Sequence, residues 1–262
     1  MPLISVHKDI RLNVEDRGSG APVVFLHALG LDLHLWDGVV SRLPDGLRAV
    51  RLDLRGHGKS DVPAAPYPMG GLVGDVEQVM QALGLREAVV VGISLGGMIA
   101  QGLAAKRLDL VRGIVLSNTA TKIATREVWA DRIAMVEAQG TAALAEATIE
   151  RWFSKSYRAA ADVTPWRARL SATDDAGFSG CAAAIAGADF YSTTAALRLP
   201  ALVIAGAHDG STPPDMVREM ADLIPGARFE LLRGSGHLPP IDAPEETAQL
   251  LTEFLRQIGH LA

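Results

Sequence analysis

The sequence predicts an α/β fold with a mostly parallel, doubly wound sheet and an inserted helical cap. Three observations support this prediction: short apolar runs alternate with helical patterns, the runs are continuous, and one long segment has no clear strand. Continuous apolar runs are typical of strands that are buried on both faces. Strands that alternate with helices imply right-handed crossovers between parallel strands.

The expected parallel strands are short apolar runs, several of them rich in the β-branched residues that suit a pleated surface. In chain order they are residues 23–26, 49–52, 88–91, 114–116, 201–204 and 229–232. Two earlier strands, around residues 3–6 and 10–15, are close enough in sequence to form an antiparallel hairpin at one edge.

Helical patterns fill the intervals between these strands. They cover residues 72–83, 95–106, 213–224 and 244–258. Gly84 suits the end of the first helix, and Pro213 and Pro214 suit the first turn of the third. Glu245 and Glu246 are favourable at the N-terminus of the fourth.

Residues 120–196 interrupt the alternation. Helices are expected there at residues 127–139, 141–153 and 175–186, and arginine and tryptophan residues cluster among them. We therefore expect residues 1–119 and 197–262 to form an α/β core, and residues 120–196 to form a helical cap.

The composition excludes several classes of protein. Hydrophobic residues make up 48% of the 262, enough for a sizeable core. The net charge of -5 gives no attraction to nucleic acid or anionic lipid. No apolar run reaches the roughly eighteen residues of a membrane span, and the N-terminus lacks the apolar core of a signal peptide.

Cys181 is the only cysteine, so an internal disulfide is excluded. Together with the composition, this favours a cytoplasmic protein that acts on a small molecule rather than on nucleic acid or a membrane. The sequence does not predict the oligomeric state.

The segment Gly92-Ile93-Ser94-Leu95-Gly96 follows an expected strand and opens an expected helix. This strand–turn–helix context is typical of a nucleophile elbow, in which a strained turn presents a serine at the C-terminal edge of the sheet. The glycines are needed because side chains two residues before and after the serine would collide. The alternative is an ordinary glycine-rich helix start, but the context favours Ser94 as a nucleophile.

A serine hydroxyl is a weak nucleophile and needs a base. His237 follows the last expected strand, and Asp209 follows the strand before it. The chain order serine, acid, histidine is the order found with such elbows, and all three loops meet at one sheet edge. We therefore predict His237 as the base and Asp209 as its partner. The competing acids, which fall in the next helix or just past the histidine, are Asp215, Asp222 and Asp242.

Backbone N–H groups near Ser94 are candidates for an oxyanion hole. The Leu95 N–H opens a helix and has no partner within it. The turn His27-Ala28-Leu29-Gly30 follows the strand at residues 23–26, and we assign the second donor to the Leu29 N–H. We interpret the His27 side chain itself as a buried structural residue.

The loop from Asp53 to Ser60 contains two glycines and basic residues, but its spacing fits neither a P-loop nor a dinucleotide fingerprint. We interpret it as a structural brace. The histidines show no metal-ligand spacing, so neither a metal nor another cofactor is expected. Cys181 lies among small residues and is interpreted as a packing residue.

These motifs resemble the α/β-hydrolase superfamily along essentially the whole chain. The cap segments at residues 117–123, 127–129, 151–153 and 181–185 resemble the bacterial 3-oxoadipate enol-lactonases. The resemblance implies hydrolysis of 3-oxoadipate enol-lactone in aromatic catabolism, by a Ser–Asp–His triad that falls on Ser94, Asp209 and His237. Residues 238–241 look more like general esterases.

A lactone that carries a carboxylate needs a cation nearby. The cap residues that could supply it, or could form apolar walls, are Arg126, Arg132, Arg151, Trp129 and Trp152. The alternative is that these are surface charges and packing aromatics.

Other functions share the same fold. The alternatives are a broad carboxylesterase or perhydrolase, a carbon–carbon bond hydrolase, and a non-catalytic ligand-binding receptor. A haloalkane dehalogenase is disfavoured because it requires a carboxylate in place of Ser94.

Overall fold

The computed structural model describes residues 3–7 and 10–262. These residues form an eight-stranded sheet in the order β1-β2-β4-β3-β5-β6-β7-β8. The strands are β1 (Leu3–Val6), β2 (Ile10–Gly18), β3 (Ala21–Leu26), β4 (Leu47–Leu52), β5 (Ala88–Ile93), β6 (Val111–Ser117), β7 (Ala201–Gly206) and β8 (Arg228–Leu232). Strand β2 runs antiparallel to both β1 and β4, and all other neighbours are parallel. The predicted α/β class and the edge hairpin are confirmed.

The order of the strands creates a switch point between β3 and β5. The chain leaves β3 in one direction to form β4 and then returns to the other side of β3 to form β5. Ligands of open α/β sheets bind in the crevice outside such a point, at the carboxyl ends of the strands. The loop after β3 and the turn after β5 both end there.

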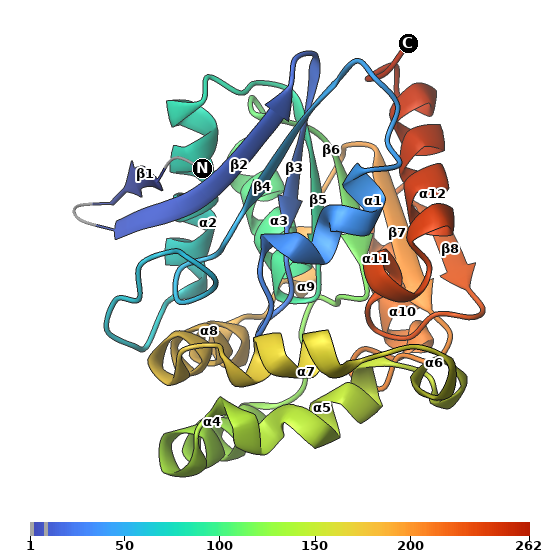
Figure 1. The fold of residues 1–262 in the computed structure, drawn as a ribbon. Helices are drawn as coiled ribbons and strands as arrows, with labels where there is room; N and C mark the ends of the chain where they lie inside the picture. Colours follow the sequence, from blue (N-terminus) through green and yellow to red (C-terminus); the bar gives the residue numbers. More distant parts are fainter. Residues whose placement is uncertain (1–2, 8–9) are drawn as a thin grey trace.

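Helices cover the sheet in two groups that pack among themselves. One group comprises α2 (Met69–Ala82), α3 (Leu95–Lys106), α9 (Tyr191–Ala195) and α10 (Pro214–Leu223). The other comprises η1 (Leu33–Trp36), α1 (Asp37–Val40), α11 (Pro239–Asp242) and α12 (Pro244–Gln257). In Figure 1, α1 and α12 lie in front of the sheet and α3 lies behind it. Strands β5 and β7 are buried along their full length, as their continuous apolar runs predict.

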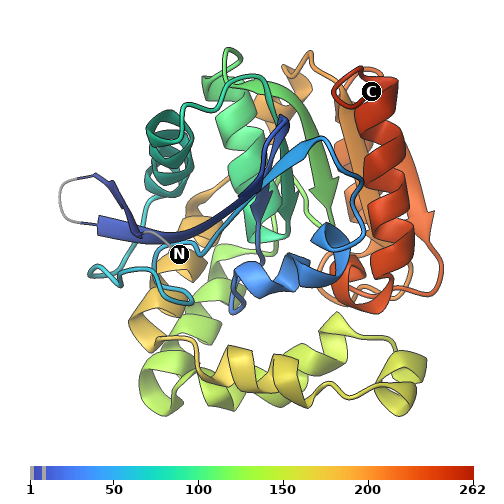
Figure 2. The same cartoon turned by 45° about the horizontal axis from the view of Figure 1, so that its top comes forward.

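Every element described between β6 and β7 is helical. These elements are α4 (Arg126–Gln139), η2 (Thr141–Leu144), α5 (Ala145–Trp152), α6 (Lys155–Ala160), α7 (Thr164–Ser171), α8 (Asp175–Gly187) and the α9 helix already named. Helices α4 to α7 form a layer beyond the C-terminal ends of the parallel strands (Figure 2). The core and cap boundaries at residues 119/120 and 196/197 stay predictions.

The sequence did not predict α6, α7 or α9. Helix α6 buries none of its residues and α7 buries only Leu170, so neither shows an apolar stripe. The segment 141–153, expected as one helix, is a 3₁₀ turn followed by α5. No helix of the described ranges is long and apolar enough to cross a membrane.

Two buried histidines join the loops after β3 and β4. His27 Nε2 accepts a hydrogen bond from the Leu54 N–H (2.9 Å), and His57 Nε2 accepts one from the Gly30 N–H (3.0 Å). Because each Nε2 is an acceptor, each ring carries its proton on Nδ1, where it donates to the carbonyls of Ala28 and Arg55. Both rings are therefore neutral, and each loop holds the other.

Burial, with a smaller contribution from the neighbouring His27, lowers the pKa of His57 to about 3. Burial also lowers the pKa of His27. Near pH 6.5 the unfolded chain binds protons that the folded protein excludes. The stability that depends on neutral rings is therefore present above about pH 6.5, and it is lost as the pH falls toward 3.

Between pH 6 and pH 4 we expect His57 alone to lower the free energy of unfolding by about 1.4 kcal/mol per pH unit. The His57→Gln variant keeps a hydrogen-bond acceptor but does not titrate. Its free energy of unfolding should therefore depend less steeply on pH than that of the wild type. Urea unfolding at a series of pH values measures both slopes. Equal slopes for the two proteins would contradict the neutral, excluded state of His57.

Candidate active site

Ser94 lies in a strained turn between β5 and α3. Its backbone has φ 53° and ψ -117°, a region that a residue with a side chain rarely occupies. Hydrogen bonds on both sides hold the turn: the Ser94 N–H donates to the Ser117 carbonyl (3.1 Å), and the Thr119 hydroxyl donates to the Ser94 carbonyl (2.7 Å). The turn therefore presents the Ser94 side chain at the edge of the sheet.

The flanking glycines allow backbones to touch. A Cβ atom on Gly92 would lie 2.2 Å from the Gly96 carbonyl oxygen, and one on Gly96 would lie 2.4 Å from the Leu26 carbonyl oxygen. Such distances are far inside van der Waals contact, so no larger residue fits without moving backbone. The collisions that the sequence predicted are present, and the second one brings α3 directly against the end of β3.

His237 and Asp209 are joined by a hydrogen bond. His237 Nδ1 lies 2.8 Å from Asp209 Oδ2, and both side chains are buried. The Asp209 carboxylate also accepts the backbone N–H groups of Ser211 (2.7 Å) and Thr212 (2.9 Å). His237 Nε2 has no hydrogen-bond partner among the described residues, so this nitrogen is available to another group.

The surroundings of Asp209 favour its charged form. Burial alone would raise the pKa of Asp209, but the charge and hydrogen bond of His237, the Asn118 amide and the Thr212 N–H outweigh it. The net result is a pKa below the usual value of an aspartate. A carboxylate that stays charged can orient the imidazole and stabilise its protonated form.

Two neighbours of Asp209 were not predicted from the sequence. Asn118 Nδ2 donates to Asp209 Oδ2 (2.8 Å) and to the Gly236 carbonyl (3.1 Å), and the Thr212 hydroxyl donates to Asp209 Oδ2 (2.7 Å). Asn118 has φ 45°, a conformation that asparagine tolerates better than most residues. The one sequence feature that could have indicated Asn118 is its position just after β6, at the same edge of the sheet as Asp209.

Asp242 braces the loop that carries His237. It accepts hydrogen bonds from the Gly236 N–H (2.7 Å) and from the Ser235 hydroxyl. Burial raises the pKa of Asp242 to about 6, although these hydrogen bonds oppose the shift. Asp215 and Asp222, the other competing acids, are exposed on α10.

A cavity of about 70 Å³ lies between this sheet edge and the cap. Ser94 and His237 both line it, together with Ala28 and Leu29. The hydrogen bonds of the described residues do not include one between the Ser94 hydroxyl and His237; such bonds are often long before substrate binds. Ser94 and His237 are therefore close enough to line one small cavity.

One of the two predicted oxyanion donors lines this cavity, and the other directly follows Ser94 in the chain. Leu29 lines it directly, and Leu95 follows Ser94 as the first residue of α3. Neither backbone N–H donates a hydrogen bond to any residue that the structure describes. Free N–H groups beside a nucleophile can stabilise a developing oxyanion.

The cap contributes two unpaired cations to the cavity. Arg132 and Arg151 both line it, and neither forms an ion pair with the described carboxylates. Arg132 lies over the Trp129 ring at 4.6 Å, and Arg151 donates to the Thr148 hydroxyl (2.9 Å). Burial lowers the pKa of both guanidinium groups, and the charge of Arg151 adds to the shift at Arg132.

One of the candidate cap residues lies outside the cavity. Arg126 is exposed in the first turn of α4 and does not line the cavity. The cavity is reached one turn later, by Trp129 and Arg132, which lie three residues apart on one face of the helix. Trp152 lines the cavity from α5, and its carbonyl accepts the His237 N–H (2.7 Å).

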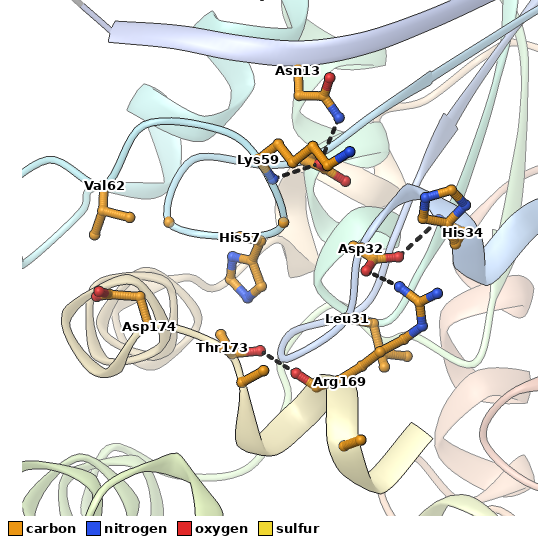
Figure 3. A pocket seen from close by; sticks show the side chains of 15 residues that line it. Asn13, Leu31, Asp32, His34, His57, Lys59, Val62, Arg169, Thr173 and Asp174 are labelled. Carbon is orange, nitrogen blue, oxygen red and sulfur yellow. Dashed lines mark hydrogen bonds and ion pairs between the residues drawn. The ribbon is translucent and has the colours of Figure 1, made fainter. Parts of the chain in front are cut away.

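A second cleft, of about 520 Å³, lies on the other side of the turn at residues 28–31. Figure 3 shows His57 from the loop after β4 facing this cleft, with Arg169 and Thr173 from the cap. Arg169 contacts Asp32 in this cleft, and the Asp53 carboxylate accepts hydrogen bonds from the backbone N–H groups of Leu33 and Lys59.

The described part of the chain contains no group of three or more His, Cys, Asp or Glu side chains placed to hold a metal ion. Cys181 is fully buried, and burial raises the pKa of its thiol. A thiol in such a place is a poor nucleophile.

Comparison with known proteins identifies relatives along the whole chain. The chain is 32% identical to 3-oxoadipate enol-lactonase 1 of Acinetobacter baylyi, over 96% of this chain and 94% of that protein. The enol-lactonase of Burkholderia xenovorans has a similar structure, with a TM-score of 0.93, 33% identity and coverage of 97% and 100% of the two chains. A thermophilic esterase from Thermogutta terrifontis also gives a TM-score of 0.93, with 30% identity and 98% coverage of each chain.

A family model described as the alpha/beta hydrolase fold matches residues 21–244. This match spans the Ser94 turn, Asp209, His237 and the inserted helices. The chain therefore belongs to the α/β-hydrolase family.

Proposed function

We propose that the protein hydrolyses a carboxylic ester or lactone, with Ser94 as nucleophile, His237 as general base and Asp209 as the acid that orients His237. The observation that carries the proposal is the shared cavity of a strained serine and a histidine whose Nδ1 is bonded to a buried carboxylate. This arrangement leaves His237 Nε2 available for the serine proton.

In the first step the Ser94 hydroxyl oxygen attacks the substrate carbonyl carbon while its proton moves to His237 Nε2. A bond forms between Ser94 Oγ and the carbonyl carbon, and the carbonyl oxygen becomes an oxyanion. The N–H groups of Leu29 and Leu95 stabilise that charge, and one such donor is typically worth about 3 kcal/mol of barrier. When the oxyanion collapses, the ester C–O bond breaks and His237 returns the proton to the leaving oxygen.

In the second step a water molecule gives a proton to His237 and attacks the acyl carbon. Collapse of this second oxyanion breaks the bond to Ser94 Oγ, and the serine regains its proton from His237. The net reaction consumes one water and releases the acid. For an enol-lactone the leaving oxygen is an enol, which becomes a ketone, so the ring cannot readily close again.

The two cap arginines at the cavity favour a substrate that carries a carboxylate. Arg132 and Arg151 are half-buried without acidic partners, and a bound carboxylate would relieve the cost of burying their charge. Trp129 and Trp152 would form apolar walls on either side. With the enol-lactonase relatives, this supports 3-oxoadipate enol-lactone as the substrate and a role in aromatic catabolism.

A broad carboxylesterase is the second candidate. The similarity to the Thermogutta terrifontis esterase supports it, because that esterase and the Burkholderia xenovorans enol-lactonase give the same TM-score of 0.93. Measuring the turnover rates of the enol-lactone and of simple neutral esters under the same conditions distinguishes the two candidates. Comparable rates on all of them would remove the lactonase assignment. The cytoplasmic location expected from the sequence stays a prediction.

The Ser94→Ala variant should lose covalent acylation completely, because no other described residue at this cavity presents a nucleophilic side chain from a strained turn. With a p-nitrophenyl ester, the wild-type protein should release a burst of nitrophenol and gain one acyl group on Ser94, as seen by mass spectrometry. The matched control is Ser211→Ala, which removes another hydroxyl that lines the cavity and should keep the burst. Acylation of the Ser94→Ala protein, or no adduct on the wild type, would refute the mechanism; the second result would indicate a ligand-binding receptor.

Neutral replacement of the cap cations should affect only anionic substrates. We expect Arg132→Gln and Arg151→Gln each to raise KM for the enol-lactone about 10- to 100-fold, since a hydrogen bond to a charged group is worth roughly 1.5–3 kcal/mol. The methyl ester of the same lactone should change by less than about threefold, because it has no charge for either arginine to bind. Arg126→Gln, outside the cavity, is the control. Equal effects on the acid and on its ester would contradict recognition of a carboxylate.

A further inference from the structure

The turn at residues 28–31, here called the oxyanion turn, separates the two cavities. Ala28 and Leu29 line the cavity that contains Ser94, whereas Leu31 lines the outer cleft. The Leu31 N–H donates to the Ala28 carbonyl (3.2 Å), and Gly30 has φ 78°, so the chain reverses within four residues. The position of the Leu29 N–H depends on how this turn is held.

Gly30 is held from two sides by different parts of the protein. On the core side, its N–H donates to His57 Nε2 (3.0 Å). On the cap side, its carbonyl accepts the Thr173 hydroxyl (3.2 Å), which follows α7 and shares its proton with the Arg169 carbonyl (3.1 Å). Figure 3 shows His57 and Thr173 facing the same outer cleft.

The cap also touches the oxyanion turn sterically. A Cβ atom on Gly30 would lie 2.4 Å from Leu170 Cδ1 and 3.7 Å from the Phe178 ring. Leu170 and Phe178 both line the Ser94 cavity as well. The cap segment from Leu170 to Thr173 therefore contacts the turn both sterically and through the Thr173 hydroxyl, in addition to the contact from His57.

We propose that Thr173 is a positioning residue, through which docking of the cap sets the Leu29 N–H for oxyanion stabilisation. The inference rests on the proposed function, because the Leu29 N–H is an oxyanion donor only if Ser94 is acylated. His57 is fixed in the core, so the cap hydroxyl is the contact that holds the other side of Gly30. Small displacements of such a donor have large effects on rate, since misplacement by about 1 Å can slow a reaction about 100-fold.

The test compares Thr173→Val with Thr173→Ser. Valine keeps the shape and removes the hydroxyl, whereas serine keeps the hydroxyl and serves as the conservative rescue. We expect Thr173→Val to slow the acylation burst with a p-nitrophenyl ester about tenfold, with KM nearly unchanged, and Thr173→Ser to acylate within about twofold of the wild type. Thermal unfolding of each variant reports whether the fold is intact.

The affinity for a trifluoromethyl ketone is a second measurement, and it should not change if Thr173 has a purely structural role. The ketone adds to the serine as a tetrahedral adduct whose oxyanion occupies the oxyanion hole. Its affinity should weaken in Thr173→Val by the same factor as the acylation rate. Binding of the lactone to the acylation-deficient Ser94→Ala protein should not change when Thr173→Val is added.

The outcomes are distinct. Equal acylation by the wild type and Thr173→Val would overturn the inference and leave the proposed function intact. Equal slowing by valine and serine would also overturn it, because the hydroxyl would then not be the feature that matters. A wild type without any burst would overturn the proposed function itself.

Discussion

The structure depends on backbone contacts that only glycine allows at the C-terminal edge of the sheet. Gly96 brings the first turn of α3 against the Leu26 carbonyl, and Gly206 brings the end of β7 against the Gly236 carbonyl, where an added Cβ would lie 1.8 Å from the oxygen. Because peptide groups are packed so closely, the three loops that carry Ser94, Asp209 and His237 leave the sheet toward one small volume. The strain of Ser94 is held by the burial of β5 and α3 on both sides.

Opposite electrostatic conditions meet in this volume. On the core side, the Asp209 charge is fully supported by hydrogen bonds, so it remains available to the imidazole. On the cap side, Arg132 and Arg151 are half-buried and form no ion pair with a described carboxylate. The first condition suits catalysis, because a buried charge that is already paired needs no rearrangement. The second suits binding, because an arriving anion completes a site that is costly while empty.

The sequence predicted what short-range chemistry determines, and it missed what the tertiary fold determines. Helix α3 has the predicted bounds, because a β-branched strand, a glycine turn and a small-residue helix are local patterns. The hydrogen bond from Asn118 to Asp209 joins residues 91 positions apart, and no local pattern reveals it. The sequence also did not show which face of α4 lines the cavity, because this helix buries only Trp129 and Val136. Without an apolar stripe, nothing in the sequence distinguished Arg126 from Arg132 as a candidate for the cavity.

The cap is joined to the core through the same loops that form the candidate site. Gly30 touches Leu170, a Cβ atom on Gly56 would lie 2.5 Å from Gly177 Cα, and one on Gly236 would lie 2.2 Å from the Trp152 carbonyl. Each contact connects a cap helix to a loop that carries or braces a functional group. The cap helices that line the cavity thus also hold the loops of the candidate site. A change in how the cap packs would therefore alter the cavity lining and the loop at residues 28–31 together, because the same cap residues contact both.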